Sequence, residues 1–138
     1  MSDKIFLDTN IIIYAYSEDE PIKQEIANSI LEKYSEQTII SNQVINELSN
    51  TLFRKFKLEA NEVQQVVLEL DDNFRIVNFN LQTQLRGIEI KGKYKLQFYD
   101  AMIIATALEN NCTILYSEDM QHGQIIENVL TIINPFKD

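Results

Sequence analysis

The chain has 138 residues, 45% of them hydrophobic and 24% charged, which is typical of one globular domain and leaves no room for a second. No apolar stretch is long enough to span a membrane and no secretory signal is present at the N-terminus, so we expect a cytoplasmic protein that forms one domain over residues 1–138 and has no membrane partner. The formal net charge of -9 argues against binding to nucleic acid unless the basic residues are clustered.

The first half of the chain predicts strands that alternate with helices. The apolar run at residues 4–8 is too short for a helix and predicts a buried strand that ends at Asp8. A proline suits the first turn of a helix, and apolar residues then recur at helical spacing, so we predict a helix at 21–34. A second strand is predicted at 38–40, and Ser41 is suited to cap the helix that follows it.

The second half of the chain continues this alternation. The predicted elements are a helix at about 60–72, a strand at 76–79, a helix from 81 that becomes a looser basic stretch at 87–95, an apolar helix at 96–110, and strands at 113–116 and 130–133. Short apolar strands separated by helices favour parallel pairing, with both faces of the sheet covered. We therefore predict an α/β fold of three layers, α/β/α, around a central, mainly parallel five-stranded sheet.

Four carboxylates occupy positions that this fold would bring together. Sites in parallel sheets form beyond the carboxyl ends of the strands, and Asp8 and Asp119 follow two of the predicted strands. Glu47 lies near the start of a helix that directly follows its strand, so it faces the same edge. Asp100 lies in an apolar helix, where an uncompensated charge is costly unless a cation or a hydrogen-bond network stabilises it.

Each of these carboxylates also has a structural interpretation. Asp8 can cap the turn formed by residues 9–10, Asp119 and Asp100 can cap helices, and Glu47 can be a solvated helix side chain. The combination is more specific than any one member, because four like charges at one edge of a sheet repel one another unless a cation is present. We therefore interpret the four carboxylates as a metal site.

The ligand set restricts the metal to one that oxygen atoms bind. The chain has one cysteine, Cys112, and one histidine, His122, which excludes an internal disulfide and zinc sites with several Cys or His ligands. We interpret Cys112 as a core residue and His122 as a surface residue. Oxygen ligands suit Mg²⁺ or Mn²⁺, and the chemistry that such a site favours is hydrolysis of a phosphodiester by a metal-activated water.

The basic residues form two clusters that adjoin acidic elements. Arg54 lies two helical turns after Glu47 on the same face, and Lys95 lies five residues before Asp100. Solvated helix faces are the alternative interpretation of both clusters. The residues that we predict to contact nucleic-acid phosphates are Arg54, Lys57, Arg86, Lys91, Lys93 and Lys95.

Four stretches resemble the PIN domain family and, within it, the VapC-type toxin ribonucleases. They are FLDTN at 6–10, SNQVINE at 41–47, YDAMIIATA at 99–107 and LYSEDM at 115–120. The resemblance implies a metal-dependent endoribonuclease that binds Mg²⁺ or Mn²⁺. It assigns the metal and the catalysis to Asp8, Glu47, Asp100 and Asp119, and supporting roles to Thr9, Asn10 and Ser117. It also implies an RNA substrate, a homodimer and, for a toxin, an antitoxin protein as partner.

Two other hypotheses use the same residues. A catalytically idle PIN domain would bind RNA or a protein without metal-dependent turnover. A phosphatase or a DNA nuclease would use the same carboxylates on other phosphoesters. The complete acidic set favours the ribonuclease over the idle domain.

Overall fold

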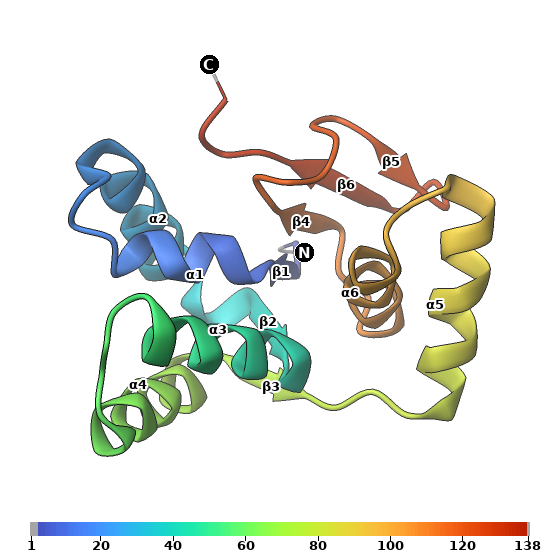
Figure 1. The fold of residues 1–138 in the computed structure, drawn as a ribbon. Helices are drawn as coiled ribbons and strands as arrows, with labels where there is room; N and C mark the ends of the chain where they lie inside the picture. Colours follow the sequence, from blue (N-terminus) through green and yellow to red (C-terminus); the bar gives the residue numbers. More distant parts are fainter. Residues whose placement is uncertain (1–2, 138) are drawn as a thin grey trace.

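The computed structural model describes residues 3–137, which fold into alternating strands and helices (Figure 1). In chain order the elements are β1 (Ile5–Leu7), α1 (Thr9–Ala15), α2 (Pro21–Lys33), a short 3₁₀ turn η1 (Ser35–Gln37), β2 (Thr38–Ser41), α3 (Asn42–Arg54), α4 (Ala60–Asn73), β3 (Arg75–Val77), α5 (Leu81–Tyr94), α6 (Phe98–Glu109), β4 (Ile114–Tyr116), β5 (Ile125–Ile126) and β6 (Leu130–Ile133). No helix in this part of the chain is both long and apolar enough to cross a membrane.

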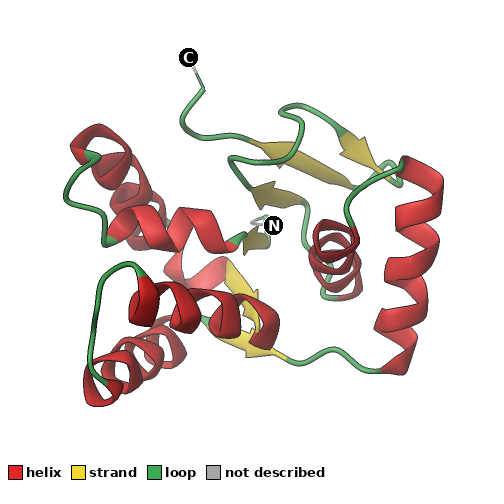
Figure 2. Ribbon diagram, in the orientation of Figure 1, coloured by secondary structure: helices red, strands yellow, loops and turns green. Residues whose placement is uncertain are grey.

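The strands form one sheet in the order β3-β2-β1-β4-β6-β5, in which every pair is parallel except β5 with β6. Helices α1 to α4 lie on one side of the sheet, and α5 and α6 lie on the other (Figures 1 and 2). The strands β1 and β2 are buried on both faces, whereas β4 is buried on one face and half-buried on the other. Phe6, Ile40 and Leu115 are fully inaccessible to solvent. The predicted three-layer α/β/α arrangement is therefore confirmed.

The sheet has six strands rather than the predicted five, because the short strand β5 pairs with β6 at the edge. The two strands are joined by a tight turn in which the Val129 N–H donates to the Ile126 carbonyl at 3.0 Å. Both central residues of this turn, Glu127 and Asn128, have positive φ, at 52° and 58°. In a sequence, a hairpin turn whose two central residues have positive φ is usually recognised by glycine, asparagine or aspartate at these positions. Glu127, at the first central position, does not indicate such a turn.

The predicted loose basic stretch at 87–95 is wrong, because α5 continues without a break through Tyr94. The helix ends at Lys95, whose φ of 56° is left-handed. Gly87 is needed for packing rather than for a turn, since a Cβ atom at this position would collide with the side chain of Met102 on α6. The glycine lets the two helices of this layer approach closely.

The two helices that begin at the carboxyl ends of β1 and β2, α1 and α3, each begin after a residue whose side chain caps the helix. Ser41 caps α3 as predicted, because its Oγ accepts from the Val44 N–H at 3.3 Å. Residues 9–10, predicted as a turn, instead form the first turn of α1. Asp8 is the N-cap of that helix, and its carboxylate accepts from the Thr9 N–H at 2.8 Å. The chain thus passes from β1 directly into a helix with no loop between them.

Substitutions at the two glycines of α5, Gly87 and Gly92, should change the stability of the fold in opposite directions. Gly92→Ala meets open space and removes a flexible residue from a helix, so it should raise the free energy of unfolding by about 0.5–1 kcal/mol. Gly87→Val forces its side chain against Met102 and should lower the free energy of unfolding by about 1–3 kcal/mol. Urea unfolding of both variants measures these changes, and equal effects at the two positions would contradict the packing of α5 on α6.

Candidate active site

The acidic residues gather where the strand order of the sheet reverses. From β1 the chain proceeds to β2 on one side, whereas β4 pairs with β1 on the other side, and ligand sites form at such a point. Backbone hydrogen bonds continue past the ends of β1 and β4. The Asp8 N–H donates to the Tyr116 carbonyl and the Ser117 N–H donates to the Ile133 carbonyl, both at 3.0 Å. Asp8 and Ser117 therefore have fixed positions at the edge of the sheet.

Asp8 is the most enclosed member of the cluster, with 6% of its surface exposed. Its Oδ1 accepts from the Thr9 N–H at 2.8 Å, and its Oδ2 accepts from the Ser117 hydroxyl at 2.7 Å. The Asn10 side-chain amide donates to the same Oδ2 at 3.4 Å. The predicted supporting residues Thr9, Asn10 and Ser117 thus all contact Asp8.

Asn10 connects the end of β1 to the loop after β4. Its Nδ2 donates to Asp119 Oδ2 at 3.1 Å, and its Oδ1 accepts from the Glu118 N–H at 3.2 Å. The Asp119 N–H in turn donates to Ser117 Oγ at 3.3 Å. Asp119 is exposed, so these contacts orient a carboxylate that remains accessible to a ligand from solvent.

Glu47 and Asp100 reach the cluster from two helices. Thr9 Oγ1 donates to Glu47 Oε1 at 3.4 Å, and Gln43 Nε2 donates to the same oxygen at 3.2 Å. Gln43 Nε2 also donates to the Tyr99 carbonyl at 3.3 Å, which ties α3 to the start of α6. Asp100 lies in the first turn of α6 and lines a cavity together with Asp119.

The electrostatic coupling of the carboxylates shows that they form one cluster. The pKa of Asp8 is raised to about 6, mainly by burial and to a smaller extent by the charges of Asp100 and Glu47, and the hydrogen bonds from Ser117 and Thr9 oppose this increase. The pKa of Asp100 is raised by burial and then by the charges of Asp119 and Glu47. The charges of Glu47, Asp100 and Asp119 therefore each raise the pKa of another carboxylate, and Asp8 is affected by two of them.

The donor chemistry of the cluster fits a divalent ion that prefers oxygen. Among residues 3–137, no three Asp, Glu, His or Cys side chains are grouped closely enough to hold an ion between them. Mg²⁺ does not require such a cage, because it usually keeps several waters and binds through one or two carboxylates together with substrate phosphate. The like charges described above are the feature that a cation would stabilise.

The predicted phosphate-binding residues do not all lie at the cluster. Lys95 lines a cavity of about 390 Å³ together with Asp100 and Asp119. Lys93 points elsewhere, since its Nζ pairs with Glu127 at 2.6 Å. The exposed cations of the other cluster, Arg54 and Lys57, lie at and beyond the C-terminal end of α3.

Sequence reasoning missed a network that holds the loop after β4. Lys23 Nζ contacts Glu118 Oε2 at 2.5 Å and lies 4.8 Å from the centre of the Tyr14 ring. The Tyr14 hydroxyl donates to Glu118 Oε1 at 2.6 Å. Lys23 and Glu118 are 95 positions apart, so no local pattern could indicate the pair. Gln43 was also missed, although its place one helical turn before Glu47 is a usable signal.

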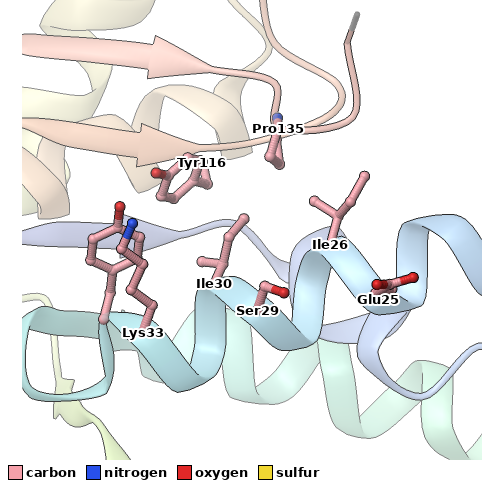
Figure 3. Close-up of a pocket in the computed structure, with 8 residues that line it drawn as sticks. Glu25, Ile26, Ser29, Ile30, Lys33, Tyr116 and Pro135 are labelled. Atoms are coloured by element: carbon pink, nitrogen blue, oxygen red, sulfur yellow. The ribbon is translucent and has the colours of Figure 1, made fainter.

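Two single residues and one further cavity lie outside this site. Cys112 is buried and His122 is exposed, as predicted. His122 Nδ1 accepts from the Asn134 N–H at 2.9 Å. A cavity of about 430 Å³ between α2 and the end of β4 is shown in Figure 3. Its lining residues are Glu25, Ile26, Ser29, Ile30, Lys33, Tyr34, Tyr116 and Pro135, and none of the four clustered carboxylates is among them.

Comparison with known proteins gives one family. The profile of the PIN domain family matches residues 5–126. A curated relative, the U3 small nucleolar RNA-associated protein 10 of Candida glabrata, is 30% identical over 116 residues, which are 75% of this chain. The chain spans only 6% of the length of that relative.

Solved structures with similar folds share less sequence with the chain. A chain of a toxin-antitoxin complex from Klebsiella pneumoniae has a TM-score of 0.74 at 23% identity and covers 98% of this chain and 100% of its own. VapC20 of Mycobacterium tuberculosis, described as a sarcin-ricin loop cleaving toxin, has a TM-score of 0.68 at 16% identity, with 81% and 87% covered. A chain of the DNA-bound VapBC complex of Salmonella typhimurium has a TM-score of 0.71 at 17% identity, with 95% and 97% covered.

The raised pKa of Asp8 predicts how stability depends on pH in the metal-free protein. Because this pKa rises from 3.8 to about 6 on folding, the folded state retains a proton that the unfolded state has lost. The contribution of Asp8 to stability is therefore greatest below pH 4 and is lost as the pH rises through 6. Asp8→Asn should raise the free energy of unfolding at pH 7 by up to about 3 kcal/mol.

Urea unfolding with a chelator at pH 5 and pH 7 measures this effect. Asp72→Asn, on the exposed surface of α4, is the matched control and should leave the pH dependence unchanged. An Asp8→Asn variant that is less stable than the wild type at pH 7 would show that the charge of Asp8 does not strain the folded state.

Proposed function

The chain belongs to the PIN domain family, and on this premise we propose that it is a metal-dependent endoribonuclease. The observation that carries the proposal is the convergence of acidic side chains at one edge of the sheet, where Thr9 joins Asp8 to Glu47 and Asn10 joins Asp8 to Asp119. Burial, and then neighbouring acidic groups, raise the pKa values of both Asp8 and Asp100. A cluster of this kind at the reversal point of a sheet is suited to hold a divalent cation against a phosphate group.

RNA is the substrate that the relatives support best. One structural neighbour is described as a toxin that cleaves the sarcin-ricin loop, and others are chains of toxin-antitoxin complexes. We propose accordingly that this chain is the toxin of such a system and that an antitoxin protein is its partner. Homodimer formation and a cytoplasmic location belong to the same proposal, and the 75% exposure of Ile22 on α2 and the 55% exposure of Leu68 on α4 are compatible with a dimer.

In the proposed site, the carboxylates bind the metal ion and neighbouring hydrogen-bond donors orient the carboxylates. Mg²⁺ or Mn²⁺ would be held by Asp8 and Asp100 with Glu47 and Asp119 beside them, and when bound it neutralises phosphate oxygens and lowers the pKa of a bound water. Ser117 and the N–H of Thr9 hold the carboxylate of Asp8 in place.

Neutral amides orient the other two carboxylates. Asn10 holds Asp119, and Gln43 holds Glu47. These donors fix the direction of each carboxylate without removing its negative charge, as the binding of a cation requires. Lys95 lines the cavity beside Asp100 and Asp119, and we propose that it contacts a phosphate of the RNA.

Replacement of Asp100 tests the proposal. Asp100→Asn should lower the rate of RNA cleavage at least about 100-fold with Mg²⁺ or Mn²⁺, because the variant loses one of the charges that hold the metal and the phosphate. The Asp72→Asn control on α4 should cleave like the wild type. Cleavage of labelled RNA, DNA and a small phosphoester is measured for identically purified proteins, with each metal and with chelator.

The alternatives give different results in the same assay. Metal-dependent RNA cleavage that persists in Asp100→Asn would contradict the assignment of the site. RNA binding by the wild type without any cleavage would indicate the idle binding domain. Faster cleavage of DNA or of the small phosphoester would indicate the other two enzyme classes.

The two neighbouring lysines after Gly92 should differ in their effect on RNA binding. Lys95→Gln should raise KM for RNA by about tenfold with little change in kcat, and should reduce the salt dependence of binding by about one unit of slope. Lys93→Gln should change KM less than about twofold, because Lys93 pairs with Glu127 and does not line the cavity that contains Asp100 and Asp119. Equal effects of the two substitutions would contradict the placement of Lys95 at the site.

A further inference from the structure

A second cavity, of about 320 Å³, adjoins the acidic cluster at Glu47. It lies between the start of α3, the loop that follows β3 and the start of α6. Its lining residues are Asn42, Gln43, Asn46, Glu47, Phe79 and Tyr99. Because Glu47 belongs to both the cavity and the cluster, anything bound in the cavity lies beside the acidic cluster.

Two aromatic residues form the apolar part of this cavity. Tyr99 immediately precedes Asp100 and is 67% exposed, so its ring contributes little to the core. The ring packs against Phe98 with the ring centres 5.4 Å apart and the planes inclined by 63°, which restricts its orientation. Phe79 lines the cavity from the loop between β3 and α5. Partly exposed aromatic rings of this kind are the usual stacking surfaces for unpaired bases.

The polar part of the cavity consists of side-chain amides. Asn42 Oδ1 is buried and has no hydrogen-bond donor within the described residues. Asn46 lies one helical turn further along α3 and lines the same cavity. Gln43, in contrast, already donates to Glu47 and to the Tyr99 carbonyl, so it forms the wall between the cavity and the acidic cluster. Amide groups both donate and accept, as the edge of a base requires.

The charge and the size of the cavity select the kind of group that it can bind. Apart from Glu47 the lining is uncharged, so a phosphate group is disfavoured and a neutral planar ring is favoured. The volume lies at the lower end of the range for ligand pockets, which suits one base rather than a base pair. A base can enter such a cavity only when it is unpaired and turned out of its stack.

We propose that this cavity binds one unpaired base of the RNA substrate, next to the bond that is cleaved. The base stacks on Tyr99 and Phe79, and the exposed side-chain amide of Asn46 contacts its edge. This inference rests on the proposed ribonuclease function and adds to it a determinant of where the RNA is cut.

The cleavage test combines a protein variant with a modified substrate. In a short single-stranded RNA with a mapped cleavage site, each nucleotide near that site is replaced in turn by an abasic one. For the wild type, one abasic position should lower kcat/KM by about tenfold or more, as the loss of one stacked base does. Tyr99→Ala should lower kcat/KM by a similar factor on the intact RNA and show no further loss at that position. Phe53→Ala, also an exposed aromatic position, is the matched control.

A binding test gives a second result that does not depend on cleavage. The Asp100→Asn protein is mixed with RNAs that carry the fluorescent base 2-aminopurine at one position each, in the presence of Mg²⁺. Stacking in the cavity should quench the fluorescence at one position, and the added Tyr99→Ala substitution should restore it.

The two tests separate this inference from the function on which it rests. Cleavage by the wild type that no abasic position affects would overturn the base pocket and leave the ribonuclease intact. Absence of cleavage by the wild type would overturn the ribonuclease, and the fluorescence assay would still decide the pocket. Quenching that is unchanged by Tyr99→Ala would show that the base stacks elsewhere.

Discussion

The burial of a carboxylate beside other carboxylates at one edge of the sheet is the constraint on which the site depends. Asp8 is buried where its pKa rises to about 6, so its charge is present at neutral pH only at a cost to the folded state. The Ser117 hydroxyl and the Thr9 N–H lower this cost without removing it, because both are neutral donors. The fold therefore keeps a negative site that a cation can stabilise, and this is the physical basis of the proposed nuclease.

The same edge of the sheet accounts for the precision of the arrangement. The strands β1 and β4 are neighbours, and backbone hydrogen bonds continue past both, so Asp8 and Ser117 cannot move independently. Asn10 fixes the position of Asp119 by donating a hydrogen bond to it. Gln43 donates both to Glu47 and to the Tyr99 carbonyl, and so connects Glu47 to the start of α6. The Thr9 hydroxyl joins the Asn10 and Gln43 contacts to one another by donating to Glu47. These three neutral side chains connect the elements without adding charges that would compete with a metal or with RNA.

Residues with a local signature could be predicted from the sequence, whereas those set by long-range contacts could not. The cap at Ser41 and the three layers follow from local patterns. The predicted sheet edge and the PIN resemblance both indicated the four carboxylates, and the structure links three of them, Asp8, Glu47 and Asp119, through Thr9 and Asn10. The hairpin of β5 was missed because Glu127 adopts a left-handed backbone without a glycine. Lys93 and Lys95 look alike in the sequence, and only the fold directs one to Glu127 and the other to the acidic cluster.

The most direct test of the account is the position of a bound metal ion. Crystals of the protein soaked in Mn²⁺ at pH 7 should show an anomalous density peak between the carboxylates of Asp8 and Asp100, with Glu47 and Asp119 close to it. The peak should disappear in crystals of the Asp100→Asn variant. An acidic cluster that stays without a peak at saturating Mn²⁺ would contradict the claim that its charges exist to bind a cation.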